Sequence, residues 1–104
     1  MSDFLHIVHF WLREDLSDER RAAFIAAARG LAASENVANC RVGVPAGTDR
    51  PVVDNSYDVQ LAVTFNDRSA HDAYQSDDDA RHAAFIAEQK DCWAKVVIYD
   101  SVSA

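Results

Sequence analysis

The chain has 104 residues, of which 49% are hydrophobic and 26% are charged. This composition is typical of a globular domain, and the length supplies a single hydrophobic core, which excludes two-domain catalytic architectures. Ten basic against seventeen acidic residues give a net charge of −7, which disfavours nucleic acid and anionic membrane surfaces as partners because both are negatively charged. We therefore expect residues 1–104 to form one domain.

The cysteines and the first residues indicate the compartment. Cys40 and Cys92 are far apart and form no CxxC pair, so we expect two reduced thiols rather than a zinc site or a redox dithiol. Residues 1–4 include no basic segment before an apolar run, and no stretch approaches the roughly 20 apolar residues of a membrane span. These features predict a cytoplasmic protein.

The first half of the chain predicts a strand, a helix and a second strand. Residues 4–13 are apolar at both alternating sets of positions, as in a strand that is covered on two faces. Ser17 is a typical N-cap residue and predicts a helix of about four turns that ends within residues 34–36. A strand is predicted at residues 37–44, and the prolines and glycine of residues 45–55 predict a loop.

The second half predicts two further strands with two short helices between them. The strands cover residues 57–65 and 93–102. Asp67 or Ser69 can cap the first helix, and the second can begin at residues 76–77. On the strand at residues 57–65, the alternation assigns one face to Tyr57, Val59, Leu61, Val63 and Phe65.

The order of these elements, β-α-β-β-α-β with a divided second helical region, predicts an α+β, ferredoxin-like fold in which helices cover one face of an antiparallel sheet. Both faces of the sheet are apolar. In the first strand, the side chains that point to either face are mostly apolar. In the last strand, the alternation places Trp93 on the same face as Val97 and Tyr99. A chain of this length has no second helical layer, so we predict a homodimer that pairs the bare sheet faces.

Five short motifs are distributed along the chain. They are His6-Ile7-Val8, Tyr57 followed by Val63-Thr64-Phe65, Ala73-Tyr74-Gln75, His82 with Phe85, and Val96-Val97-Ile98-Tyr99-Asp100. In their order and spacing, these motifs resemble those of the stress-responsive dimeric A/B-barrel (Dabb) family over almost the whole chain. The resemblance implies a ferredoxin-like protomer and a homodimer whose two sheets form a central barrel.

The resemblance also implies a candidate site. The family includes a plant polyketide cyclase that makes olivetolic acid without a cofactor, and this chain is distantly similar to it. By position, His82 resembles its catalytic histidine, Tyr74 the tyrosine before it, and His6 a further pocket histidine, whereas Val59 replaces another histidine. The implied roles are His82 as base, Tyr74 as hydrogen-bond donor to an oxyanion and His6 as an orienting residue, with neither metal nor cofactor.

The sequence is compatible with two functions. The first is a Dabb protein that binds a small hydrophobic ligand in a pocket between sheet and helices. The second is a cofactor-independent enzyme, polyketide cyclase-like or monooxygenase-like, that uses His82 and Tyr74. The alternative to both is structural, with His6 bonded in the core and His82 tying a helix to the sheet. A solvent-open apolar cavity of about 300 Å³ beside both imidazoles would favour a functional role.

Other noticeable residues are assigned structural roles. His9 and Trp11 lie on the face of the first strand opposite His6, so we expect them to pack in the dimer interface. His71 is expected to lie in solvent. The three acidic residues at 77–79 are explained by the start of a helix, where carboxylates are favoured, rather than by a cation site.

Overall fold

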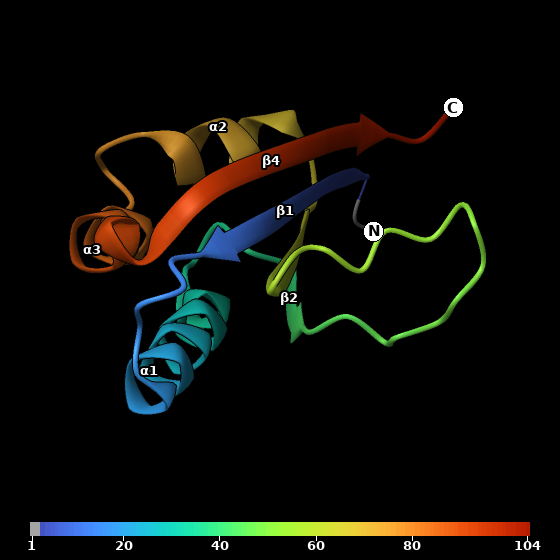
Figure 1. The fold of residues 1–104 in the computed structure, drawn as a ribbon. Coiled ribbons are helices and arrows are strands. Elements are labelled where there is room, and N and C mark those ends of the chain that lie inside the picture. Colours follow the sequence, from blue (N-terminus) through green and yellow to red (C-terminus); the bar gives the residue numbers. More distant parts are fainter. Residues whose placement is uncertain (1–2) are drawn as a thin grey trace.

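The structure is a computed structural model that describes residues 3–104, and its helices and strands match the predicted order (Figure 1). The strands are antiparallel and lie in the order β2-β3-β1-β4, which is the ferredoxin-like arrangement and confirms the predicted α+β fold class. In chain order the elements are β1 (Phe4–Leu12), α1 (Asp18–Arg29), the 3-10 turn η1 (Gly30–Ala33), β2 (Asn39–Gly43), β3 (Val59–Phe65), α2 (Arg68–Gln75), α3 (Ala80–Gln89), the 3-10 turn η2 (Lys90–Cys92) and β4 (Trp93–Val102).

One face of the sheet forms the hydrophobic core with the helices. The two central strands, β1 and β3, bury every second residue, as the two-residue period of a strand requires. A register slip of one residue would turn all of these side chains to the other face, so the core fixes the register. The buried positions are Phe4, His6, Val8, Phe10 and Leu12 in β1 and Val59, Leu61, Val63 and Phe65 in β3.

Helix α1 is anchored to the sheet by Phe24. The helix begins as predicted, with the Ser17 side chain accepting a hydrogen bond from the backbone N–H of Arg20. The Phe24 side chain is fully buried, and its ring centroid lies 5.0 Å from that of Phe10 and 5.7 Å from that of Phe85. Phe24 therefore joins α1, α3 and β1 in one core.

Two aromatic side chains lie on faces opposite to those predicted. Tyr57 precedes β3, and its ring packs 4.8 Å from that of His9 on the face away from the helices. A register shift near the end of β1 turns Trp93 to the helix side, where its ring lies 5.2 Å from that of Phe10. The simple alternation that grouped Trp93 with Val97 was wrong because it assumed a strand without an irregularity.

An aspartate side chain caps the N-terminus of each of the two short helices. The side chain of Asp67 caps α2, as predicted. Helix α3 begins later than predicted, because Asp79 caps it rather than a residue at 76–77. Ser76 instead follows the end of α2, where its hydroxyl donates a hydrogen bond to the carbonyl of Ala73.

No described helix covers the other face of the sheet. Four half-buried residues of β1 lie on it, including His9 and Trp11, as predicted. Ile7 lies between Ala62 of β3 and Tyr99 of β4 in this face. We call this surface the open face; its central row of side chains comprises Leu5, Ile7, His9 and Trp11.

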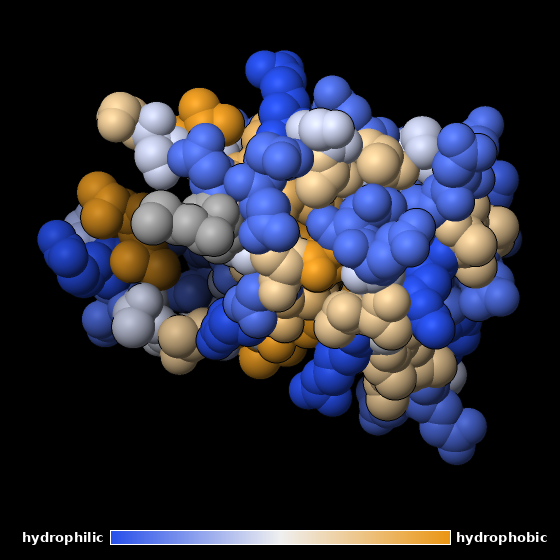
Figure 2. Space-filling view, turned by 180° about the vertical axis from the view of Figure 1, so that it is seen from behind, coloured by the Kyte–Doolittle hydropathy of each residue, from blue (hydrophilic) through white to orange (hydrophobic). Residues whose placement is uncertain are grey.

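Residues 44–58 form a long loop between β2 and β3 that extends away from the sheet (Figure 1). In the view from behind, hydrophobic surface is visible at the end of the molecule that carries this loop and the C-terminus (Figure 2). Val52 in the loop and Val102 near the C-terminus are both exposed. Across residues 3–104, every helix falls short of the length and apolar character that a membrane span requires.

Candidate functional site

A cavity of about 120 Å³ lies between the sheet and helices α2 and α3. Its walls are mainly apolar, and its polar lining consists of His6, Tyr74, Gln75 and His82. The exposed side chain of Ile98 on its wall marks the side that meets solvent. The structure therefore brings the three predicted site residues, His6, Tyr74 and His82, to one cavity that is connected to solvent. The cavity is smaller than the volume of about 300 Å³ that is typical of ligand pockets.

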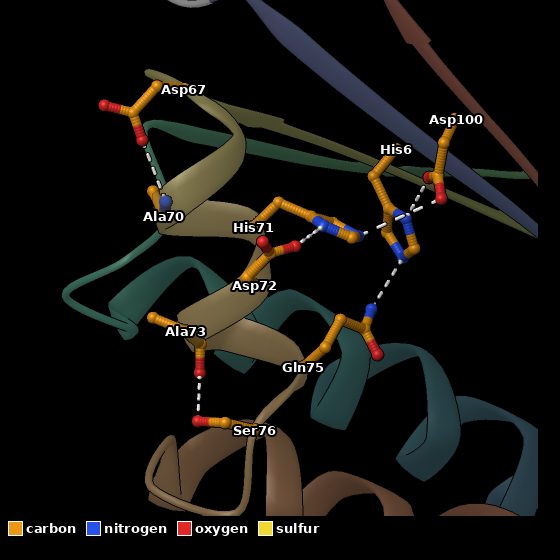
Figure 3. A network of polar contacts seen from close by, with 9 residues as sticks. All are labelled: His6, Asp67, Ala70, His71, Asp72, Ala73, Gln75, Ser76 and Asp100. Carbon is orange, nitrogen blue, oxygen red and sulfur yellow. Dashed lines mark hydrogen bonds and ion pairs between the residues drawn. The ribbon is translucent and has the colours of Figure 1, made fainter.

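His6 lies on β1 and is held at both ring nitrogens. Its Nδ1 lies 2.5 Å from Oδ1 of Asp100, its direct neighbour across the β1–β4 pair, and its Nε2 lies 3.5 Å from Nε2 of Gln75 (Figure 3). Burial lowers the pKa of His6 below its ordinary value, and the hydrogen bond and charge of Asp100 offset this effect only in part. The imidazole is therefore neutral at pH 7, and a carboxylate orients it rather than a backbone group or a tyrosine.

His82 and Tyr74 lie in contact on the helix side of the cavity. Their ring centroids are 4.2 Å apart, and the centroid of Tyr74 lies 6.1 Å from that of His6. Burial lowers the pKa of His82, although the charge of Asp79 opposes this effect. Burial also raises the pKa of Tyr74. At pH 7 the cavity thus combines a neutral imidazole with a phenol that keeps its proton.

Asp100 and His71 belong to the same polar cluster and were not predicted for it. Nε2 of His71 lies 3.9 Å from Oδ2 of Asp100 (Figure 3). The His71 ring is stacked on that of Phe4, with the ring centroids 4.2 Å apart. The His71 side chain is only 15% exposed, so the expectation that it lies in solvent was wrong. Pairing the first and last strands would have placed Asp100 opposite His6, but the sequence does not fix that register.

Asp79 positions the start of α3, and with it His82. One carboxylate oxygen accepts the backbone N–H of His82 at 3.0 Å. The other accepts hydrogen bonds from the Ser34 hydroxyl at 2.6 Å and from the Asn36 amide at 3.0 Å. These partners after η1 explain why Asp79, rather than an earlier polar residue, caps the helix. The three acidic residues at 77–79 therefore do not form one site, because the Asp79 side chain is buried whereas Asp77 and Asp78 are exposed.

We expect Asp79→Ala to lower the free energy of unfolding by about 1–3 kcal/mol at pH 7, since it removes a cap and leaves the buried Ser34 hydroxyl without its acceptor. Burial would raise the pKa of Asp79, but hydrogen bonds from Ser34, His82 N–H and Asn36 lower it overall. The ionised carboxylate thus stabilises the fold above its unfolded-state pKa of about 3.9, and this contribution is lost as the pH falls through the lower folded-state pKa.

Urea unfolding of both proteins from pH 7 to pH 2.5 measures this dependence. The difference between wild type and Asp79→Ala should be largest at neutral pH and shrink below about pH 4. The matched control is Asp78→Ala, at an exposed neighbouring position, which should change the free energy of unfolding by less than about 0.5 kcal/mol. A difference that grew in acid would contradict the assignment.

Comparison with known proteins agrees with the fold. The fold is that of a ferredoxin-like α+β domain with a cavity between sheet and helices. The model of the Stress Responsive A/B Barrel Domain family (Dabb) matches residues 4–103. The chain belongs to this family, as its motifs predicted. No curated protein sequence matches the chain closely enough to count as a relative.

Solved structures of low sequence identity share the fold. A Dabb family protein from Mesorhizobium loti is 21% identical, with a TM-score of 0.79 over 100% of this chain and 99% of that one. A dimeric ferredoxin-like protein of unknown function from Thermobifida fusca is 20% identical, with a TM-score of 0.77 over 98% and 92%. A hydroxynitrile lyase from Passiflora edulis is 17% identical, with a TM-score of 0.71 over 99% and 94%.

Proposed function

We propose that this Dabb protein forms a homodimer through the open face and binds a small hydrophobic ligand in the cavity beside His6, Tyr74 and His82. The observation that carries the proposal is an apolar cavity whose few polar groups converge from β1, α2 and α3. Ligand pockets typically combine apolar walls with a small number of placed polar groups. The dimeric neighbour from Thermobifida fusca supports the assembly, since it shares the fold.

The size and lining of the cavity define the class of ligand. An engineered apolar cavity of about 150 Å³ binds benzene, so the cavity of about 120 Å³ here suits one ring or a short branched chain. Neutral His82 offers an acceptor, and Tyr74 offers a hydroxyl donor. A small phenol or a small hydroxylated or carbonyl compound fits both properties, whereas an extended polyketide exceeds the volume.

Binding can be tested with 4-bromophenol as the probe. Isothermal titration calorimetry should detect one molecule per chain. Ile98→Trp should weaken binding at least about tenfold, because the larger side chain closes the side on which the cavity meets solvent. Val52→Trp, in the exposed loop, is the matched control and should bind like wild type. Equal binding by wild type and Ile98→Trp would place the probe elsewhere and refute the proposal.

A second candidate function is a cofactor-independent enzyme, cyclase-like or monooxygenase-like, acting on a small aromatic or carbonyl substrate. It is favoured by the packing of neutral His82 against protonated Tyr74, whose ring centroids lie 4.2 Å apart. His82 would accept a proton from an acidic carbon or hydroxyl, Tyr74 would donate a hydrogen bond to the resulting oxyanion, and His6 would orient the substrate. The hydroxynitrile lyase from Passiflora edulis supports the capacity of this fold to carry an enzyme.

Turnover of a panel of phenolic and carbonyl compounds separates the two functions. For an enzyme, His82→Ala should lower kcat by about 10²–10⁴-fold while 4-bromophenol binding changes less than tenfold. Tyr74→Phe should lower kcat with the fold retained, since only the hydroxyl is removed. A loss of stability in His82→Ala, with no turnover by wild type on any compound, would eliminate the enzymatic candidate and leave ligand binding.

A further inference from the structure

Three side chains next to the cavity present ligand atoms to a common point. They are His6 on β1, His71 on α2 and Asp100 on β4, and one ring nitrogen or carboxylate oxygen from each lies within 4.8 Å of the others (Figure 3). Within residues 3–104, no other set of histidine, cysteine and acidic side chains meets this condition. The set comes from three elements, so the fold assembles it rather than a local run of acidic residues.

The core holds two of the three ligands in place. His6 is buried, and the β1–β4 register places it directly opposite Asp100. His71 is fixed by its stacking on Phe4, with the ring centroids 4.2 Å apart. Asp100 is the adjustable member, because its side chain is 40% exposed. An ion at this point would therefore have a rigid pair of imidazoles and a carboxylate that can rotate toward it.

On each imidazole, the ring nitrogen that points away from the common point also has a polar partner. Nδ1 of His71 lies 3.1 Å from Oδ1 of Asp72, so its N–H faces a carboxylate and its Nε2 lone pair faces Asp100. Nδ1 of His6 faces the Asp100 carboxylate, so an ion bound to Nδ1 would shift the ring proton to Nε2. The oxygen of the Gln75 amide can accept that N–H when the amide is turned. Metal-binding histidines in proteins are typically held in this way through the second ring nitrogen.

We propose that His6 Nδ1, His71 Nε2 and the Asp100 carboxylate bind a divalent transition-metal ion of the Zn²⁺ type, with water at the remaining position. Two imidazoles and one carboxylate suit such an ion better than Mg²⁺ or Ca²⁺, which prefer oxygen ligands. Bonds of about 2.0–2.2 Å to a tetrahedral ion separate ligand atoms by about 3.3–3.5 Å. The Asp100 carboxylate must therefore move away from His6, because its Oδ1 lies only 2.5 Å from Nδ1 of His6. It must also move closer to His71, because its Oδ2 lies 3.9 Å from Nε2 of His71.

This inference goes beyond the proposed function and does not depend on it. The ion would bind to Nδ1 of His6, whereas the cavity ligand would meet the Nε2 side near Gln75. The test uses Zn²⁺ alone, without any cavity ligand. Failure of Zn²⁺ binding would therefore leave ligand binding in the cavity unaffected, and failure of 4-bromophenol binding would leave the metal site unaffected.

The experiment is calorimetric titration of Zn²⁺ into the full chain after treatment with a chelator and dialysis. Wild type should bind one ion per chain. Asp72→Asn should weaken binding by about 10–100-fold, because it alters only the partner that orients His71. Asp100→Asn and His71→Ala should weaken it further. Asp77→Asn is the control, since it makes the same change of charge at an exposed position outside the cluster.

Circular dichroism should be used to check that each variant is folded. If His71→Ala does not fold, Asp100→Asn still tests the site. Titration with Co²⁺ adds a spectroscopic reading, because visible absorption reports the coordination geometry in wild type and its loss in Asp100→Asn. Unchanged Zn²⁺ affinity in Asp100→Asn, or an equal loss in Asp77→Asn, would overturn the proposal. Less than half an ion per wild-type chain at saturating Zn²⁺ would overturn it as well.

Discussion

Ile7→Lys is expected to convert the proposed homodimer into a monomer at micromolar concentration. Ile7 lies at the centre of the open face, between Ala62 and Tyr99. In a symmetric interface both copies carry the substitution, so two ammonium groups would be buried without partners. This cost is several kcal/mol, and the dissociation constant of the dimer should rise by at least about 100-fold.

Sedimentation velocity at several protein concentrations measures the change in mass. In a monomer the lysine would lie in water, so the folded protomer should persist and circular dichroism should be unchanged. Val52→Lys, which adds the same charge on the exposed loop, is the control and should remain dimeric. A wild-type protein of single-chain mass at micromolar concentration would refute the proposed assembly.

Phe24→Ala is expected to lower the free energy of unfolding by about 3–5 kcal/mol, the usual cost of removing a buried phenylalanine. Phe24 is fully buried, and its ring contacts the rings of Phe10, Phe85 and Trp93 across three elements. Urea unfolding at one fixed protein concentration provides the measurement, because a dimer makes apparent stability depend on concentration.

Phe24→Leu is the matched variant at this position. It retains most of the apolar volume and should cost less than about 2 kcal/mol. The large difference between the two variants would show that filled volume at this position holds α1, α3 and the sheet together. A cost below about 1 kcal/mol for Phe24→Ala would mean that Phe24 is not at the centre of the core.

Most of the fold could be predicted from the alternation of apolar residues and from the helix caps. The period of two at positions 59–65 and the signals at Ser17 and Asp67 correspond directly to β3, α1 and α2. The face of Trp93 could not be predicted, because one irregularity in strand pairing inverts the alternation. The start of α3 was also missed, because the hydrogen bonds of Asp79 are made to residues distant in sequence.

The site was predictable only in part. The positions of His6, Tyr74 and His82 followed from the family resemblance, and the structure places all three around one cavity; their catalytic roles stay predictions. Asp100 and His71 were not predicted, since their proximity to His6 depends on the β1–β4 register and on the packing of α2. Such contacts between distant segments are set by tertiary packing, which local patterns do not specify.

The most direct test of the proposed ligand site is X-ray diffraction from crystals soaked in 4-bromophenol, with data collected at the bromine absorption edge. A bromine peak is expected inside the cavity, with the phenol oxygen within hydrogen-bonding distance of His82 or Tyr74. Bromine peaks confined to other surfaces, or no peak at a saturating concentration of the probe, would contradict the assignment of this cavity as the ligand site.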